Sequence, residues 1–207
     1  MCDESVTIMM RKLFESNRGD VKLIIQHDER FRSSGTKVDH HKSENFILNV
    51  DSYIIRSQSS YIDKLLTMLA KDKKEYIIDL SEYNKNAVII LFRYIYCREP
   101  YILAHVSWDT LFQLLNITLK FQIDGYRTSI TKDIIQNTTP DNAIDILLSY
   151  IKYNKRHSAE ISIKCVNTIV DHIINTKIKD RTKTSFDINN IKLLPFDYRD
   201  EILKRIL

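Results

Sequence analysis

The stretch that decides the fold runs from Asn45 to Cys97 and alternates short apolar runs with polar turns. Its parts are FILNV at 46–50, SYIIRSQSSYIDKLLTML at 52–69, YIIDL at 76–80 and NAVIILFRYIYC at 86–97. Short runs rich in β-branched residues predict strands, and apolar residues spaced three and four apart predict helices. The predicted order is therefore a strand, two short helices, a strand and a helix. The last helix is apolar nearly all round, which is typical of a buried helix.

The segment before this stretch predicts a helix and a strand. Residues 4–16 have apolar residues at helical spacing, and Gly19 follows as a helix-ending residue. Residues 20–25 are rich in β-branched residues and predict a strand. The polar residues 26–44 then predict a long hairpin loop. The predicted apolar face of the first helix consists of Ile8, Met9, Leu13 and Phe14.

The segment after this stretch predicts helices only. Apolar residues recur at helical intervals from Trp108 to Leu119, and a second helix is expected to about Gln136. Pro140 suits the first position of a new helix. Further helices are expected up to Ile151, over 158–174 and from Leu193 to Leu207, with a polar connection at 177–189. We therefore predict two domains, residues 1–136 and residues 137–207.

Composition is that of an ordinary globular protein, with 43% hydrophobic and 28% charged residues among 207. No apolar run approaches the roughly 20 residues that span a bilayer, so we expect no membrane association. The acidic start Met-Cys-Asp-Glu is unlike a signal peptide. We expect a cytoplasmic protein, with the nucleus as the alternative, and reduced thiols at the three widely spaced cysteines.

Catalytic, cofactor and metal motifs are not found, and we predict no enzyme activity. Three isolated glycines exclude the usual phosphate-binding loops, and no nucleophile motif pairs a cysteine with a histidine. Asp39-His40-His41 is the one candidate metal site. Consecutive residues of an extended chain point to opposite sides, and no further ligand lies at suitable spacing. We therefore expect a solvated loop there rather than a metal ion.

Basic residues gather in the C-terminal part. The segment from Ile151 to Lys183 contains eight lysines and arginines but only three aspartates and glutamates. Such a cluster indicates either a patch for nucleic acid or an acidic protein, or simply solvated helix faces. We favour solvated faces, because aromatic residues for base stacking are few there. The eight are Lys152, Lys155, Arg156, Lys164, Lys177, Lys179, Arg181 and Lys183.

The order of elements resembles the BTB/POZ fold. That family has a Ser-x-Tyr-Phe helix start and a Tyr-(Ile/Cys)-Tyr helix end, and this chain has Ser59-Ser60-Tyr61-Ile62 and Tyr94-Ile95-Tyr96. LLNITLKFQIDGYRTSITKDI at 114–134 is similar to the BTB C-terminal hairpin. Residues 137–207 resemble the start of a BACK domain through their helix spacing and Leu193-Leu194-Pro195. The whole is similar to short, truncated kelch-like proteins of large DNA viruses, especially poxviruses.

This resemblance implies an α+β fold, with a helical cluster flanked by a small mixed sheet and followed by an all-α BACK-like module. It also implies protein–protein interaction without chemistry. The implied partners are a second copy of the chain and either cullin-3 or full-length kelch-like proteins, in a role as ubiquitin ligase adaptor or competitor, directed at host pathways if the chain is viral. The alternative function is a transcription- or nucleic-acid-associated regulator that uses the basic C-terminal module.

Particular residues are assigned by this resemblance. Ile8, Met9, Leu13 and Phe14 would form the dimer interface, although the same face could instead cover the core of its own domain. Tyr61, Met68 and Glu75 would face a cullin-type partner. Leu65 and Leu69, on the same helix as Tyr61, are expected in the core.

Three departures from the family pattern bear on these assignments. Ser52 stands where the family has a basic residue that pairs with the aspartate matching Asp20, and Asp51 stands where it has histidine. A charged Lys73 occupies the hydrophobic position of the family's hydrophobic-x-Glu element, Lys73-Lys74-Glu75. The connection at 26–44 is longer than the usual hairpin. We expect the Asp20 pairing to be lost and cullin binding to be weakened.

Overall fold

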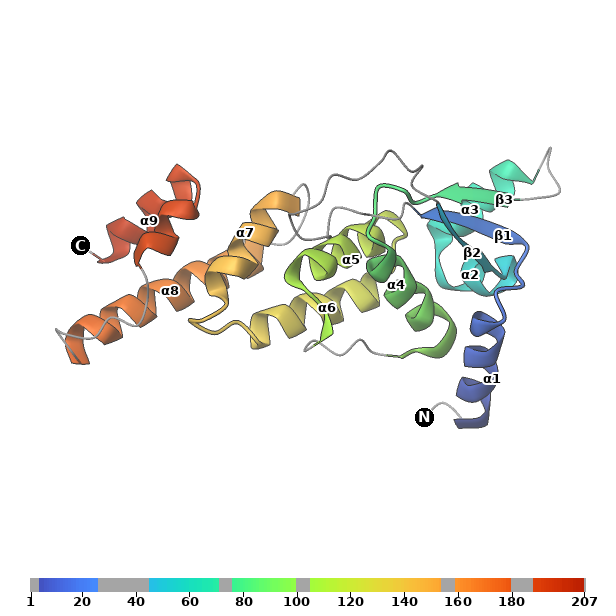
Figure 1. Cartoon of the computed structure of the whole chain (residues 1–207), viewed down its shortest axis with the longest axis horizontal. Coiled ribbons are helices and arrows are strands. Elements are labelled where there is room, and N and C mark those ends of the chain that lie inside the picture. The colour runs from blue at the N-terminus through green and yellow to red at the C-terminus, as the bar shows by residue number, and fades with distance from the viewer. Residues whose placement is uncertain are drawn as a thin grey trace, which may run out of the picture. The chain divides into compact units, whose positions relative to one another are not determined.

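The computed structural model describes residues 4–25, 45–70, 76–99, 105–153, 159–179 and 188–206 (Figure 1). The chain divides into two compact units, residues 1–124 and residues 125–207. Each unit is treated separately below. The predicted boundary after residue 136 lies further along the chain than this division and stays a prediction.

A three-stranded mixed sheet forms in the first unit, in the order β2-β1-β3. The strands are β1 (Val21–Ile25), β2 (Phe46–Val50) and β3 (Tyr76–Asp79). Strand β1 pairs antiparallel with β2 and parallel with β3, so that Val21 lies opposite both Val50 and Tyr76. Alternate β1 residues Val21, Leu23 and Ile25 are buried, as expected for a strand with one face on the core.

The helices of the first unit confirm the predicted order. They are α1 (Glu4–Glu15), α2 (Ser52–Gln58), α3 (Ser60–Leu69), α4 (Lys85–Cys97) and α5 (Trp108–Lys120). Helix α4 is the central one: it contacts α1, α2 and α5, and Figure 1 shows it between α1 and α5. As predicted, most of its side chains are buried: Ala87, Val88, Leu91, Phe92, Ile95, Tyr96 and Cys97.

Side-chain caps explain where these helices begin. The Asp51 carboxylate accepts hydrogen bonds from the N–H groups of Tyr53 and Ile54 in α2, and Ser59 Oγ accepts one from the N–H of Ile62 in α3. Asn84 and Ser107 cap α4 and α5 in the same way. Each cap satisfies N–H groups that have no partner within the helix. The polar residues between the apolar runs therefore fix the helix boundaries.

In its described residues the second unit consists of helices joined by turns. Helix α6 (Asp124–Gln136) begins at the division between the units and is followed by α7 (Ala143–Tyr153), α8 (Ala159–Lys179) and α9 (Phe196–Ile206). Helix α8 packs against α7 and α9. The core includes Ile146, Leu147, Cys165, Val166, Ile169 and Ile202.

Two features of the second unit differ from the prediction. Helix α8 runs to Lys179, beyond the predicted end at Ile174, because no glycine or proline interrupts residues 174–179. A 3-10 helix, η3 (Ile188–Leu193), precedes α9 where a polar connection and the start of the last helix were expected. Ile191 and Leu194 are buried, which holds this turn in place.

Gly19 lies where the backbone between α1 and β1 passes very close to β2. A Cβ atom at Gly19 would lie 1.9 Å from the carbonyl carbon of Val50 and 2.0 Å from its oxygen. Real atoms do not approach so closely, so a side chain here would force two backbone segments apart. This close approach requires glycine, in addition to any role in ending the helix.

We expect Gly19→Ala to lower the free energy of unfolding by about 2 kcal/mol, because the added methyl group overlaps backbone atoms of Val50. Urea unfolding followed by circular dichroism measures this. Gly125→Ala is the matched control: nothing lies within 4 Å of its added Cβ, and alanine favours the helix. A Gly19→Ala protein as stable as the Gly125→Ala protein would contradict the prediction.

Candidate functional site

Helix α1 is held to the first unit near its C-terminal end. Phe14 is only 7% exposed, and its ring centroid lies 5.2 Å from that of Tyr96 on α4. One turn earlier, Arg11 Nη2 lies 2.5 Å from Glu99 Oε1. Phe14 was predicted at a dimer interface, but its side chain contacts the core of its own domain. Phe14 is therefore not part of the exposed surface of α1.

The turn after α1 is fixed against the edge strand β2. Asn17 has a positive φ of 52°, which asparagine tolerates better than most residues. Its Oδ1 accepts a 2.6 Å hydrogen bond from the N–H of Asn49, and Asn49 Nδ2 donates to the Asn17 carbonyl at 3.2 Å. These bonds satisfy part of the open edge of the sheet. They also fix the direction in which α1 leaves the sheet.

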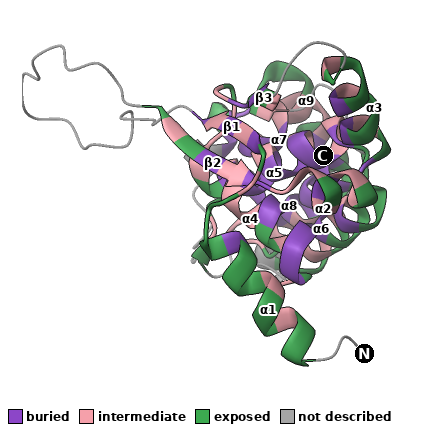
Figure 2. Ribbon diagram, turned by 90° about the vertical axis from the view of Figure 1, so that its right-hand side faces the viewer, coloured by how far each residue is buried: buried purple, intermediate pink, exposed green. Residues whose placement is uncertain are grey.

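An apolar stripe remains exposed on α1 and consists of Val6, Met9 and Leu13, with Met9 60% exposed. Their spacing of three and four residues places them on one face. Ile8 is also exposed, but it lies five residues before Leu13 and so points about 140° away. The prediction that Ile8 shares a face with Met9 and Leu13 was therefore wrong. In Figure 2, α1 is largely coloured as exposed.

The exposed stripe of α1 is unusual for so short a helix. Of its 12 residues only Phe14 is buried. Helices of this length are marginal in water unless an apolar face is covered. Adjacent exposed apolar side chains on a monomer also mark surfaces that bind proteins. Val6 was missed from sequence, although its spacing from Met9 and Leu13 would have identified it.

Three elements meet where α2 begins. The N–H of Ser52 donates a 2.7 Å hydrogen bond to Asp20 Oδ1, just before β1. The N–H of Asp51 donates to the Tyr96 hydroxyl at 2.5 Å, and the Asp51 carboxylate caps α2. The expected loss of the Asp20 pairing is thus offset by a backbone donor. A carboxylate at a helix N-terminus is also favoured by the helix dipole.

The pKa values of this cluster follow from its contacts. Burial raises the pKa of Asp20, but hydrogen bonds from the Ser52 side chain and backbone, with the Arg56 charge, outweigh burial and leave that pKa below its usual value. Burial raises the pKa of the Tyr96 hydroxyl to about 12, so it stays protonated at neutral pH. Asp20 is therefore an ionised acceptor and Tyr96 a neutral one.

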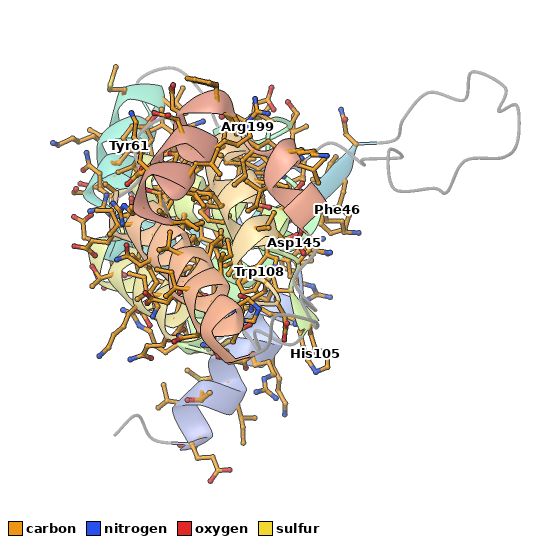
Figure 3. All side chains as sticks on the ribbon, turned by 90° about the vertical axis from the view of Figure 1, so that its left-hand side faces the viewer. Phe46, Tyr61, His105, Trp108, Asp145 and Arg199 are labelled. Carbon is orange, nitrogen blue, oxygen red and sulfur yellow. The ribbon has the colours of Figure 1, made fainter. Side chains whose placement is uncertain are left out.

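A second apolar stripe lies on α3. Tyr61, Leu65 and Met68 follow each other at spacings of four and three residues, so they share one face. Met68 is 75% exposed, while Tyr61 and Leu65 are half-buried. The Tyr61 ring stacks on Phe121 with centroids 6.1 Å apart, and Figure 3 labels its position on α3. The core residues of α3 are Ile62 and Leu66, so the prediction that Leu65 and Leu69 are core was wrong: both are half-buried.

The other side of α3 is polar and tied to α2. Arg56 Nη2 donates to Thr67 Oγ1 at 2.9 Å, and Arg56 Nε lies 3.1 Å from Asp63 Oδ1. Ion pairs this exposed stabilise a protein by at most about 1 kcal/mol. Their effect here is to fix the angle between the two helices. The apolar stripe of α3 is thereby presented on a rigid support.

Several predicted residues lie outside the described part of the chain. These are Glu75 and Lys73, the loop 26–44 with Asp39-His40-His41, and Lys155, Arg156, Arg181 and Lys183. Of the basic cluster, Lys152 lies 4.8 Å from the centroid of the Tyr153 ring, and Lys164 is exposed. No observation on the described residues therefore favours the nucleic-acid alternative.

Metal and membrane features were sought in the same described ranges. Within them, no three His, Cys, Asp or Glu side chains gather as a metal site would require. No helix in these ranges has both the length and the apolar character needed to cross a membrane. The expectation of no cofactor and no enzyme activity stays a prediction.

Comparison with protein families identifies one domain. The BTB/POZ domain model matches residues 40–138, so the chain contains a BTB/POZ domain. Strand β1 precedes the match, yet it is the central strand between β2 and β3, which lie inside it. The folded domain therefore extends at least to Val21. A comparison with curated proteins found no match.

A BTB/POZ domain suggests a role in protein–protein interaction, and such domains commonly self-associate. The apolar stripes on α1 and α3 each carry a largely exposed methionine, Met9 and Met68. The particular interface residues are not tested by the family match. They enter the proposal below with the corrections that the geometry requires.

We expect Asp20→Asn to lose stability at pH 7, because a neutral amide accepts less strongly from Ser52. Since folding lowers the pKa of Asp20, its contribution is complete above the unfolded pKa of about 4 and is lost as pH falls through the lower folded value. The stability gap between wild type and Asp20→Asn should therefore close as pH falls from 6 to 3 in urea unfolding.

Ser52→Pro provides the control. Ser52 is the first residue of α2, where proline is favoured, and Asp51 has the extended conformation that precedes proline well. The substitution removes only the N–H and hydroxyl that face Asp20. In this background the Asp20→Asn gap should shrink at pH 7, and an unchanged gap would contradict our assignment.

Proposed function

We propose that this protein is a homodimeric BTB adaptor for a cullin-3 ubiquitin ligase, or a competitor of such adaptors. The main support is the exposed stripe Val6, Met9 and Leu13 on a helix in which only Phe14 is fully buried. In this proposal the stripe of α1 is the self-association surface, and the stripe of α3 faces the ligase scaffold.

Self-association through α1 fits the geometry of a two-fold interface, in which the same patch meets itself. The stripe is apolar and therefore self-complementary without charge repulsion. The turn after α1 is fixed by Asn17 and Asn49, so the helix is presented in a constant direction. A preorganised surface loses less entropy when it binds.

Light scattering after size exclusion should give twice the 24.5 kDa mass of one chain. We expect Met9→Asp to weaken the dimer about a hundredfold, because it places an unpaired charge in the apolar contact. Ile8→Asp is the matched control. Ile8 is next to Met9 in sequence and is also apolar and exposed, but its side chain points away from the stripe. This substitution should leave the dimer intact.

Two outcomes would overturn the self-association proposal. One is a monomeric wild-type protein at tens of micromolar. The other is a Met9→Asp protein that remains dimeric while its circular dichroism spectrum is unchanged. Equal loss of the dimer in Ile8→Asp and Met9→Asp would show that the interface is not the stripe defined by Val6, Met9 and Leu13.

The α3 stripe supports the scaffold-binding part of the proposal. Met68 is largely exposed, and Leu65 and Tyr61 beside it are half-buried. A partner could therefore contact Met68 from several sides and pack against the other two side chains. Large apolar and aromatic side chains of this kind dominate binding energy at protein interfaces. The Tyr61 ring rests on Phe121, so little side-chain freedom remains to be lost on binding.

Binding of the purified N-terminal region of cullin-3 can be measured by calorimetry. We expect Met68→Asp and Tyr61→Ala each to weaken it at least about tenfold, because both remove anchor contacts. Ile77→Asp is the control: Ile77 is an exposed aliphatic residue on β3. No wild-type binding, or equal loss with Ile77→Asp, would contradict the scaffold-binding proposal without affecting the dimer proposal.

Residues 137–207 complete the proposal as an incomplete BACK-like module. The support is the succession of packed helices α7, α8 and α9 and the Leu193-Leu194-Pro195 turn before α9. A module of this kind would hold a partner other than the scaffold. The resemblance to truncated poxvirus kelch-like proteins would make the affected pathways those of a host cell.

A further inference from the structure

A pocket of about 540 Å³ lies in the first unit, away from the two stripes. It is bordered by α4 from its cap Asn84 to Arg93, and by residues 105–110, which include the first turn of α5. Its size falls within the range of about 300–1,000 Å³ that is usual for ligand pockets. None of the proposed dimer or scaffold residues lines it.

The α4 wall of the pocket is a continuous face. Asn86 lies three and four residues before Ile89 and Ile90, and Arg93 lies four and three residues after them, so all four lie on one side of the helix over two turns. Ile89 and Ile90 are half-buried, and half-buried Val106 contributes from the segment before α5. These three side chains give the pocket an aliphatic centre.

The rim of the pocket carries one guanidinium, that of Arg93, and one imidazole, that of His105. Arg93 and His105 are both exposed at its edge, and Figure 3 shows His105 at the periphery of the molecule. The nine described residues that line the pocket include no carboxylate. Arg93 is therefore available for a carboxylate from outside, and arginine binds carboxylates strongly because two N–H groups can donate together.

The walls of the pocket are preformed. Asn84 Oδ1 accepts from the N–H of Asn86 at 2.7 Å, and the N–H of Asn84 donates to Gln113 Oε1 on α5 at 2.5 Å. On the other side Ser107 Oγ lies 2.9 Å from Thr110 Oγ1. The bond from Asn84 to Gln113 ties the start of α4 to α5, and the other two bonds each fix the start of one helix. The pocket is therefore preorganised, and binding of a ligand orders few additional groups, which reduces the entropic cost of binding.

We propose that this pocket binds a short acidic segment of a partner protein in which an aliphatic residue lies next to Asp or Glu. The aliphatic side chain contacts Ile89, Ile90 and Val106, and Arg93, with His105, holds the carboxylate. The side-chain amide of Asn86, which can both donate and accept, pairs with the peptide backbone. Charge complementarity with a rim that lacks carboxylates selects this partner over basic or neutral peptides.

The test uses phage-displayed random dodecapeptides selected on the full chain, with the best sequence resynthesised carrying fluorescein. We expect the selected peptides to combine Asp or Glu with Leu, Ile or Val. Fluorescence polarisation should then show at least about tenfold weaker binding to Arg93→Glu, since a charge-assisted contact becomes a repulsion. Higher salt should weaken wild-type binding.

Arg18→Glu is the matched control, because Arg18 is an exposed arginine in the same unit outside the pocket and the charge change is the same. It should bind the peptide within about twofold of wild type. Selected peptides without this composition, or peptides that bind Arg93→Glu as well as they bind wild type, would overturn the proposal. Melting curves of both variants verify that they are folded.

Discussion

The start of α2 is the point on which the first unit depends. There the backbone N–H groups of Asp51 and Ser52 are bound by Tyr96 and Asp20, while the Asp51 carboxylate satisfies the next two N–H groups of the helix. One helix terminus thus joins β1, β2, α2 and α4. Exposed helix ends are satisfied by water, whereas a partly buried one needs protein partners, and here each partner comes from a different element.

This junction also determines what α1 presents. Tyr96 bonds to Asp51 through its hydroxyl and contacts Phe14 through its ring, so the same side chain fixes both α2 and the end of α1. With Phe14 covered and the turn at Asn17 bound to β2, the first turns of α1 extend from the domain. The surface proposed for self-association is therefore a consequence of packing several residues away.

Much of this fold could be predicted from sequence, because strand alternation, helical spacing and capping residues are local signals. The order of the elements along the chain, the two short helices after β2 and the burial of α4 follow from them, whereas the order β2-β1-β3 within the sheet is not a local property. The side-chain placements were less predictable. Ile8 was assigned to the wrong side of α1 because its spacing from Leu13 was overlooked. The burial of Phe14 and Leu65 depends instead on tertiary neighbours: Tyr96 covers Phe14, whereas Leu65 stays partly open to solvent.

The pairing of β1 has a consequence for how the chain folds during synthesis. Val21 lies opposite Val50 and Tyr76, so the central strand emerges from the ribosome before either neighbour, and its parallel partner follows only after α2 and α3. Bringing such distant segments together costs loop-closure entropy and slows folding. Until then VKLII has two open edges, and an apolar strand in that state is prone to aggregate. The nascent chain therefore depends on rapid completion of β3 or on a chaperone that covers β1.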